Sequence, residues 1–290
     1  MKKKKLKGHD TNVKCVRWSP DGEILGSGDE FGGLCLWNRD GDKLKKLNVS
    51  ELDVKGIAWA PNGKFFAEVG GKIIKFLDRD GNIIKEFDGK SNQIEWLAWS
   101  PDGNLLATDS MECIVRLWDK DGNLVKELEG HTAYIGGIAW SPNGEMLATG
   151  SNDGSIKIWD KEGNIIKDLK EYYEAATDVA FSPDGGILAV GTWMARHIRL
   201  YDTITWDGSK LAAAHMDKIS SVTWLSSGQM LASGSADKSV RFWKRDGSFV
   251  EKINVGKGVN AISISSDDKM LAVASWDKKL LLYDLAELKK

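Results

Sequence analysis

The phrase Trp99-Ser100-Pro101-Asp102-Gly103 decides the fold of this chain, because it returns at nearly constant intervals along the sequence. All five prolines of the 290 residues lie in this register, separated by 41, 40, 41 and 41 residues. Copies without proline follow at residues 224–228 and 264–268, which gives seven repeats of about 41 residues. The copies that contain proline begin at Trp18, Trp59, Trp99, Trp140 and Phe181. A period of this length is typical of propellers and other repeat arrays.

Short apolar segments separated by turn residues predict four strands in each repeat. In the fourth repeat these segments cover residues 135–140, 145–150, 155–159 and 165–169. Pro-Asp-Gly and Asp-Gly-Asn clusters suit the turns, since proline presets φ and glycine tolerates a positive φ. No segment keeps a 3.6-residue apolar period, so we expect essentially no helix. One small sheet cannot bury two apolar faces alone, whereas seven sheets stacked around an axis can.

A pair of residues similar to Trp-Asp closes each repeat, and these pairs indicate a family. Gly-His also opens two repeats, at residues 8–9 and 130–131. The closing pairs are Trp37-Asn38, Leu77-Asp78, Trp118-Asp119, Trp159-Asp160, Tyr201-Asp202, Trp243-Lys244 and Tyr283-Asp284. The chain therefore resembles the WD-repeat (tryptophan-aspartate repeat) β-propeller family over nearly its whole length. This resemblance implies an all-β fold, a seven-bladed β-propeller of four-stranded antiparallel blades in a single domain over residues 1–290.

The lysine-rich start of the chain is expected to close the ring. Only residues 285–290 follow the last Trp-Asp-like pair, whereas residues 2–7 precede the first Gly-His without a repeat of their own. By resemblance to the family, residues 2–7 complete the last blade. Lysines suit an exposed blade edge because they discourage pairing between edges. Nuclear import and phosphate binding are the alternative interpretations of this run.

Composition limits the classes of function. Lys+Arg 40 against Asp+Glu 42 leaves a formal charge of −2, which is not that of a general nucleic-acid binder. The sequence shows no signal peptide and no apolar run long enough to span a membrane. Three cysteines fit a reducing compartment. Metal and nucleotide motifs are absent from the sequence. We expect a cytoplasmic monomer without cofactor or metal.

Histidines recur at repeat spacing, and the family resemblance places them in buried structural networks. One network comprises His131, Thr149, Asp153 and Trp159, and a second comprises His215, Ser233, Asp237 and Trp243. Recurrence favours a structural role over a hydrolase triad, since a catalytic site is normally single. In the first repeat, Phe31 stands in the aspartate position, so that network is expected to be incomplete. The repeat does not explain His197, which we expect at the surface or at a strand edge rather than on a metal.

Aromatic and methionine residues are expected to gather at one end of the ring. In the WD-repeat family, the Gly-His loops and the turns joining second to third strands share one rim, which we call the aromatic rim. Such residues are enriched at protein interfaces, although packing between neighbouring loops is an alternative role for them. The candidate contact residues are Phe31, Tyr134, Tyr172, Tyr173, Trp193, Met194, Arg196 and Trp276, with Lys14, Lys55 and Glu95 at the mouth of the central channel.

These features predict a non-catalytic scaffold or adaptor that docks a protein or peptide on the aromatic rim. An enzyme with Glu95, Asp178 and His197 at the channel mouth is a second hypothesis, because unrelated propellers place catalytic groups there. The repeats are also uniform, as residues 119–123 beside residues 160–164 illustrate. Uniformity suits a third hypothesis, an engineered or idealised repeat sequence with no selected partner.

Overall fold

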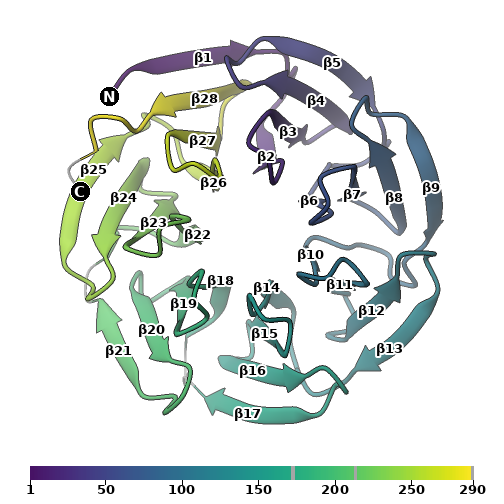
Figure 1. Cartoon of the computed structure of the whole chain (residues 1–290), viewed down its shortest axis with the longest axis vertical. Coiled ribbons are helices and arrows are strands. Elements are labelled where there is room, and N and C mark those ends of the chain that lie inside the picture. The colour runs from purple at the N-terminus through teal and green to yellow at the C-terminus, as the bar shows by residue number, and fades with distance from the viewer. Residues whose placement is uncertain (171–173, 212–213, 289–290) are drawn as a thin grey trace.

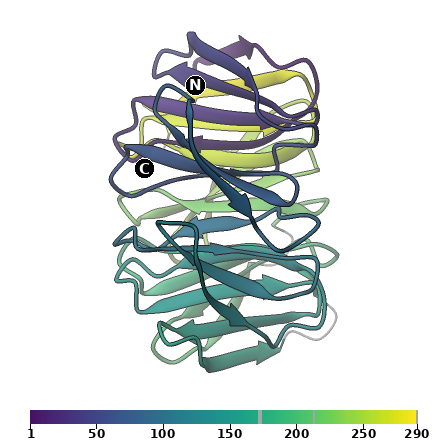
Figure 2. The same cartoon turned by 90° about the vertical axis from the view of Figure 1, so that its right-hand side faces the viewer.

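A computed structural model describes residues 1–170, 174–211 and 214–288 of the chain. All regular structure in these residues is β-strand, arranged as seven four-stranded antiparallel sheets around a central axis (Figure 1). The predicted all-β, seven-bladed propeller is therefore confirmed. Seen edge-on, the strands run from one rim of the disc to the other (Figure 2).

The blades follow one another in chain order, and each is a simple meander. Blade 1 contains β2 (Val13–Trp18), β3 (Ile24–Asp29), β4 (Gly33–Asn38) and β5 (Lys43–Asn48). Blade 2 contains β6 (Gly56–Trp59), β7 (Phe65–Val69), β8 (Ile73–Asp78) and β9 (Ile83–Asp88), and blade 3 contains β10 (Leu97–Trp99), β11 (Leu105–Thr108), β12 (Val115–Asp119) and β13 (Leu124–Leu128). Blade 4 contains β14 (Ile135–Trp140), β15 (Met146–Ser151), β16 (Ser155–Asp160) and β17 (Ile165–Lys170).

The remaining blades keep the same order of strands, with the first strand nearest the axis and the fourth outermost (Figure 1). Blade 5 contains β18 (Ala176–Phe181), β19 (Ile187–Thr192), β20 (Ile198–Asp202) and β21 (Gly208–Leu211). Blade 6 contains β22 (Ile219–Trp224), β23 (Met230–Ser235), β24 (Ser239–Lys244) and β25 (Phe249–Asn254). Blade 7 contains β26 (Val259–Ile264), β27 (Met270–Ser275) and β28 (Lys279–Asp284), and its outer strand comes from the other end of the chain.

That outer strand is β1 (Lys3–Lys7), which confirms the predicted closure of the ring. β1 pairs antiparallel with β28, so that Lys3 lies opposite Tyr283 and Lys7 lies opposite Lys279. Figure 1 shows the two strands side by side. Leu6 is the one buried side chain of β1, and it packs in a cluster that includes Leu280. Closure therefore joins the two ends of the chain by backbone pairing and by apolar burial.

The recurring phrase explains both the turns and the packing of the blades. In blade 3, the Ser100 hydroxyl donates to Asp102 and accepts the Leu105 N–H, while Gly103 adopts a φ of 72° that suits glycine. The aromatic residue at the start of the phrase reaches the preceding blade. Trp99 Nε1 donates to the Ala58 carbonyl oxygen over 3.2 Å. The copies that begin at Trp59, Trp99, Trp140 and Trp224 thus form both a turn within one blade and a hydrogen bond to its neighbour.

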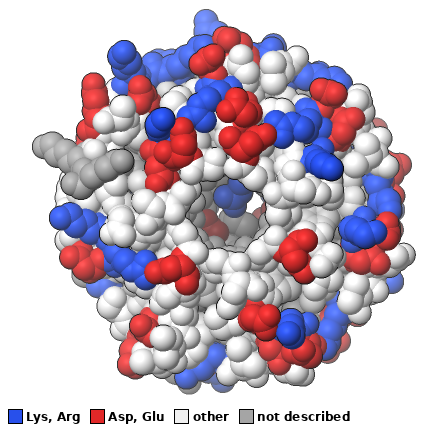
Figure 3. All heavy atoms as spheres, viewed as in Figure 1, with Lys and Arg blue, Asp and Glu red and all other residues white. Residues whose placement is uncertain are grey.

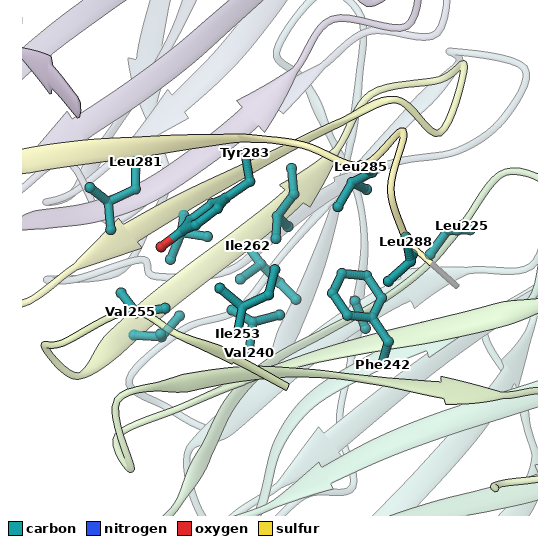
Figure 4. Packing of buried hydrophobic residues seen from close by; sticks show 14 of the residues in the cluster. Leu225, Val240, Phe242, Ile253, Val255, Ile262, Leu281, Tyr283, Leu285 and Leu288 are labelled. Atoms are coloured by element: carbon teal, nitrogen blue, oxygen red, sulfur yellow. The ribbon is translucent and has the colours of Figure 1, made fainter. Parts of the chain in front are cut away.

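The apolar core lies between adjacent blades rather than at the axis. Figure 4 shows this packing at the junction of blades 6 and 7, where Phe242 and Ile253 of blade 6 face Leu281 and Tyr283 of blade 7. The inner strands show why the sequence folds this way, since β14 alternates buried and partly buried side chains. The partly buried positions of the inner strands are therefore left to line the central channel.

Candidate binding site at the central channel

A cavity of about 560 Å³ occupies the central channel where it opens at the aromatic rim. Five residues predicted from the sequence line it, and they come from five successive blades. These residues are Lys14, Lys55, Glu95, Tyr134 and Trp193. Figure 3 shows the channel as an opening at the centre of one face of the disc, with a basic side chain visible inside it. Parts of the chain that are far apart in sequence thus meet at one hollow.

Four other predicted contact residues lie outside the cavity wall. Phe31 and Met194 are 73% and 77% exposed. Arg196 donates from Nη1 to the Met216 carbonyl oxygen over 3.1 Å. Trp276 donates from Nε1 to Asn260 Oδ1 over 2.6 Å, and Asn260 itself lines the cavity. Tyr172 and Tyr173 lie outside the described residues.

Trp193 stands at the mouth of the cavity beside a cation. The Lys218 Nζ lies 4.9 Å from the centroid of the indole ring, within the range of a cation–π contact. Both side chains line the cavity, together with Tyr134 and Met111. The contact orients the indole while leaving it 48% exposed. The mouth therefore offers aromatic surface whose position is set by the protein itself.

The lysines predicted at the channel mouth are both ion-paired. Lys14 Nζ lies 2.7 Å from Glu30 Oε1, and Lys55 Nζ lies 3.0 Å from Glu95 Oε1. A second carboxylate, that of Asp53, is 3.6 Å from Lys55. Although burial lowers the pKa of Lys55, the two carboxylates outweigh burial and raise it. Lys55 is therefore charged at neutral pH.

Sequence reasoning missed three charged residues of the cavity wall, namely Arg17, Asp109 and Lys218. A signal for Arg17 exists, because residues 58, 98, 139 and 180 at the same place in the repeat are all alanine. Asp109 is buried, and its Oδ1 accepts the N–H groups of Glu95 and Trp96, each over 2.9 Å. Burial raises the pKa of Asp109 to about 7 despite these hydrogen bonds.

The two predicted histidine networks are present in blades 4 and 6. In blade 4, His131 Nδ1 lies 3.0 Å from Asp153 Oδ2 and its Nε2 lies 2.8 Å from Thr149 Oγ1, which also accepts the Trp159 N–H. Blade 6 repeats these contacts with the residues His215, Asp237, Ser233 and Trp243. Burial raises the pKa of Asp237, whereas the contacts with His215 and Ser239 lower it. The net result is a lowered pKa. Each network links two strands, the turn between them and the loop before its blade.

The expectation that blade 1 lacks this network was wrong. His9 Nδ1 lies 2.8 Å from Asp29 Oδ2, and His9 Nε2 lies 2.7 Å from Ser27 Oγ, which accepts the Trp37 N–H. Asp29 ends β3, two residues before Phe31, and its other oxygen accepts N–H groups of the following turn. Although burial opposes it, this set of donors lowers the pKa of Asp29 to about 2. In blade 1 the carboxylate of the network therefore comes from Asp29, at the end of β3, and not from the later position that Phe31 occupies.

Of the two expected locations of His197, the surface was wrong, whereas the residue does lie at the edge of a strand. Its side chain is buried just before β20, and its Nε2 lies 2.7 Å from Glu174 Oε2. Burial lowers the pKa of His197 more than Glu174 raises it. The sequence could not reveal this contact because Glu174 reaches His197 from the loop that precedes the blade. Of the candidates for an enzyme, only Glu95 lines the cavity, whereas Asp178 and His197 are buried.

Blade 2 replaces the histidine network by different chemistry. Glu68 stands where blades 1, 3, 4 and 6 carry a serine or threonine, while Ser50 stands at the histidine position and Leu77 at the tryptophan position. The Glu68 side chain is buried and its Oε1 has no hydrogen-bond partner among the described residues. Burial raises the pKa of Glu68 to about 7, although Lys75 on the facing strand opposes the shift.

The described residues contain neither a metal-binding cluster nor a membrane-spanning helix. No group of three or more histidine, cysteine, aspartate or glutamate side chains there is arranged to hold a metal ion. The described residues also form no helix of the length and apolarity needed to cross a membrane.

Comparison with known families agrees with this architecture. Residues 2–38 and 81–119 match the WD domain, G-beta repeat, and residues 110–290 match the IFT122 first beta-propeller. The chain belongs to the WD-repeat β-propeller family. One similar protein is the Periodic tryptophan protein 2 homolog of Schizosaccharomyces pombe (strain 972 / ATCC 24843), which is 38% identical over 78 residues. That segment covers 26% of this chain and 9% of the relative. WD-repeat propellers generally serve as scaffolds for protein interactions and are typically non-catalytic.

Proposed function

We propose that this WD-repeat propeller is a scaffold that docks a peptide or protein segment on the aromatic rim, across the mouth of the channel. The observation that carries the proposal is the exposure of large apolar side chains around one cavity. Trp193, Tyr134 and Met111 line the cavity and are each more than 40% exposed. Monomeric soluble proteins rarely expose a contiguous group of large apolar side chains unless it forms a binding surface. Aromatic residues of this kind are also enriched among the hot spots of interfaces.

The distribution of exposed apolar residues between the two rims also supports docking on the aromatic rim. Phe31, Met194, Met216 and Trp276 belong to loops and turns of the aromatic rim and are exposed. Apart from the blade 5 turn, where Ile204 is 87% exposed, the opposite rim consists mainly of the Ser-Pro-Asp-Gly turns and the Asp-Gly turns, whose side chains are mostly engaged in hydrogen bonds within the turns. An apolar rim opposite a polar one favours docking from a single side.

The test is a quantitative pull-down with the full chain immobilised, followed by measurement of the Kd of each stoichiometric partner. The wild type is compared with a Trp193→Ala/Trp276→Ala double variant. A matched control, Ile84→Ala/Ile166→Ala, removes exposed apolar side chains from the outer strands instead. The proposal expects the rim variant to weaken binding by at least 10-fold and the control to bind as the wild type does. Equal binding by all three proteins would contradict it.

A further inference from the structure

The charge of the channel cavity differs from that of the whole chain. Four basic and two acidic side chains line it, whereas the chain as a whole carries slightly more acidic than basic residues. The lining charges are Lys14, Arg17, Lys55, Lys218, Glu95 and Asp109. Because the pKa of Asp109 is about 7, this carboxyl group carries only part of its charge at neutral pH. Because Glu30 and Asp53 also pair with Lys14 and Lys55, the cations of the wall without a carboxylate partner among the described residues are Arg17 and Lys218.

The acidic groups of the cavity already have donors. Glu95 Oε1 accepts from Lys55 over 3.0 Å and from Gln93 over 2.5 Å. Asp109 accepts two backbone N–H groups, as described above. The lysines are likewise occupied, Lys14 and Lys55 by carboxylates and Lys218 by the Trp193 ring. These contacts leave one charged side chain of the wall to be accounted for.

That side chain is Arg17. It lies on the innermost strand β2, is partly buried, and makes no side-chain hydrogen bond or ion pair with any part of the chain that the structure describes. The corresponding residues of the other blades are small, namely Ala58, Ala98, Ala139, Ala180, Thr223 and Ser263. Arg17 lines the cavity. Burial raises the pKa of Asp178 in blade 5 to about 6, and the Arg17 charge opposes this shift. Asp178 is not its ion-pair partner, since the Asp178 oxygens accept the Val179 and Val222 N–H groups.

An arginine in this position has a specific chemical preference. Its guanidinium is charged at every physiological pH and offers five N–H donors in a fork that matches a carboxylate. A partly dehydrated cation without an acceptor gains more from such a pair than an exposed one. The small residues around the ring leave space for a side chain or chain end to reach it. The aromatic residues at the mouth would contact the apolar residues beside that group.

We propose that the segment docked by this propeller is an acidic peptide, one carboxylate of which enters the channel and pairs with Arg17. This inference rests on the proposed function, because it names the chemistry of the partner at the same site. The carboxylate comes either from an aspartate or glutamate side chain or from the C terminus of the partner. Lys218, which no carboxylate of the described residues pairs with, contributes a favourable field at the entrance.

The probe is a library of random twelve-residue peptides displayed on phage and selected against the immobilised full chain. Recovered sequences are expected to contain more aspartate and glutamate than the input library. One recovered peptide is then synthesised with a free and with an amidated C terminus, and its Kd is measured by fluorescence anisotropy. A Kd that depends on the terminus assigns the carboxylate to the chain end, and a Kd that does not assigns it to a side chain.

Arg17→Gln is expected to weaken binding of that peptide at least 10-fold, and Arg17→Lys is expected to weaken it less. The matched control is Arg245→Gln, which removes an arginine paired with Asp184 on the opposite rim and should leave the Kd unchanged. Replacing the acidic residue of the peptide by its amide should cost as much as Arg17→Gln, and the two changes together should cost no more than either alone. If Arg17→Gln does not fold, the wild type is measured instead. Its Kd for the peptide is expected to rise between 50 and 500 mM salt, because salt screens the attraction between the carboxylate and Arg17.

The outcomes separate the two ideas. Peptides that require Trp193 and Trp276 but are not acidic, or that bind Arg17→Gln as tightly as the wild type, would overturn the acidic-peptide inference and leave the proposed function intact. Peptides that bind the Trp193→Ala/Trp276→Ala variant unchanged would overturn the proposed function. A library from which no sequence is enriched would overturn both.

Discussion

The Lys45 ammonium group donates a hydrogen bond to the main-chain carbonyl oxygen of Asp80, 2.6 Å away, and ties the outer strand of blade 1 to a turn of blade 2. Lys4 makes the same bond to Asp40 over 2.7 Å, from blade 7 to blade 1. Lys85 does so from blade 2 to blade 3. Lysine therefore has two roles on these exposed edges: it discourages pairing with another chain and it connects neighbouring blades.

We predict that Lys45→Met lowers the free energy of unfolding by about 0.5–1 kcal/mol, because a charged donor to a carbonyl oxygen is lost at a largely exposed site. Lys167→Met is the matched control. Lys167 holds the same position in blade 4, but it makes no such hydrogen bond to the described part of blade 5, whose turn has a different sequence. Urea denaturation of the two variants measures the difference, and equal losses would contradict the role of this bond.

Ring closure predicts a larger effect at Leu6. Leu6 is 2% exposed and packs with Leu280 and Leu282. We expect Leu6→Ala to lower the free energy of unfolding by about 2–4 kcal/mol, since it leaves a cavity in the closing blade. Deletion of residues 2–7 should lower the melting temperature further, because it also removes the pairing of β1 with β28. Lys5→Ala, in the same strand but exposed, should cost less than about 0.5 kcal/mol.

The histidine network of blade 1 predicts a large loss of stability for a substitution of Asp29 and a small loss for a substitution of Phe31. Asp29→Ala should cost about 2–3 kcal/mol of unfolding free energy, because His9 and two backbone N–H groups lose their acceptor in a buried place. Phe31→Ala should cost less than about 0.5 kcal/mol, since the ring is exposed. Thermal and urea denaturation of both variants test this assignment. A larger loss for Phe31→Ala would restore the original interpretation of the sequence.

We predict that the stability of the folded chain depends on pH through the buried carboxyl group of Glu68. Its pKa is about 7 in the folded chain against 4.5 ordinarily, because burial disfavours the charged form. The folded state therefore binds more protons than the unfolded state between pH 4.5 and 7, and stability falls as the pH rises through this window. The full cost, on the order of 3 kcal/mol, is present above pH 7 and is absent below pH 4.5.

Glu68→Gln removes this titration while keeping the shape of the side chain. We expect the variant to be more stable than the wild type at pH 8 and to lose most of that advantage at pH 4.5. The measurement is the difference in unfolding free energy between the two proteins at both values of pH, which cancels the titration of all other groups. A difference that does not change with pH would show that Glu68 has the same pKa in the folded and unfolded states.

Much of the fold could be predicted because each blade repeats a local pattern. The phrase around Pro101 sets a turn through residues close in sequence, and its Trp99 makes the inter-blade hydrogen bond to Ala58, one repeat earlier. Closure by residues 2–7 followed from the phase of the repeat. The location of Lys14, Lys55, Glu95, Tyr134 and Trp193 around one cavity followed in turn from the blade geometry.

The features that could not be predicted depend on contacts between distant segments. The carboxylate of Asp29 replaces a later aspartate because the turn after β3 is shaped differently from that of blade 4. His197 is buried by Glu174, which arrives from another loop. Arg17 differs in the sequence from the alanines at the same place in four other repeats, but its lack of a partner and its place in the cavity wall are seen only in the structure. None of these arrangements has a signature within a single repeat.

Three tryptophans separate the roles of scaffold and rim. Trp159 is 1% exposed and its Nε1 donates to Thr149 in the blade 4 network, so Trp159→Ala should cost about 3–5 kcal/mol of unfolding free energy. Trp193 and Trp276 are 48% exposed, and each single change to alanine should cost about 1 kcal/mol or less.

Binding and stability should therefore move independently in these variants. Trp193→Ala and Trp276→Ala are expected to weaken capture of a rim ligand while the melting temperature changes by only a few degrees. Trp159→Ala is expected to lower the melting temperature strongly, and any of it that is folded should bind as the wild type does. Differential scanning calorimetry beside anisotropy on the same samples makes the comparison. A strong loss of stability from both rim changes would mean that these indoles pack the loops together, and the docking surface would then have to lie elsewhere.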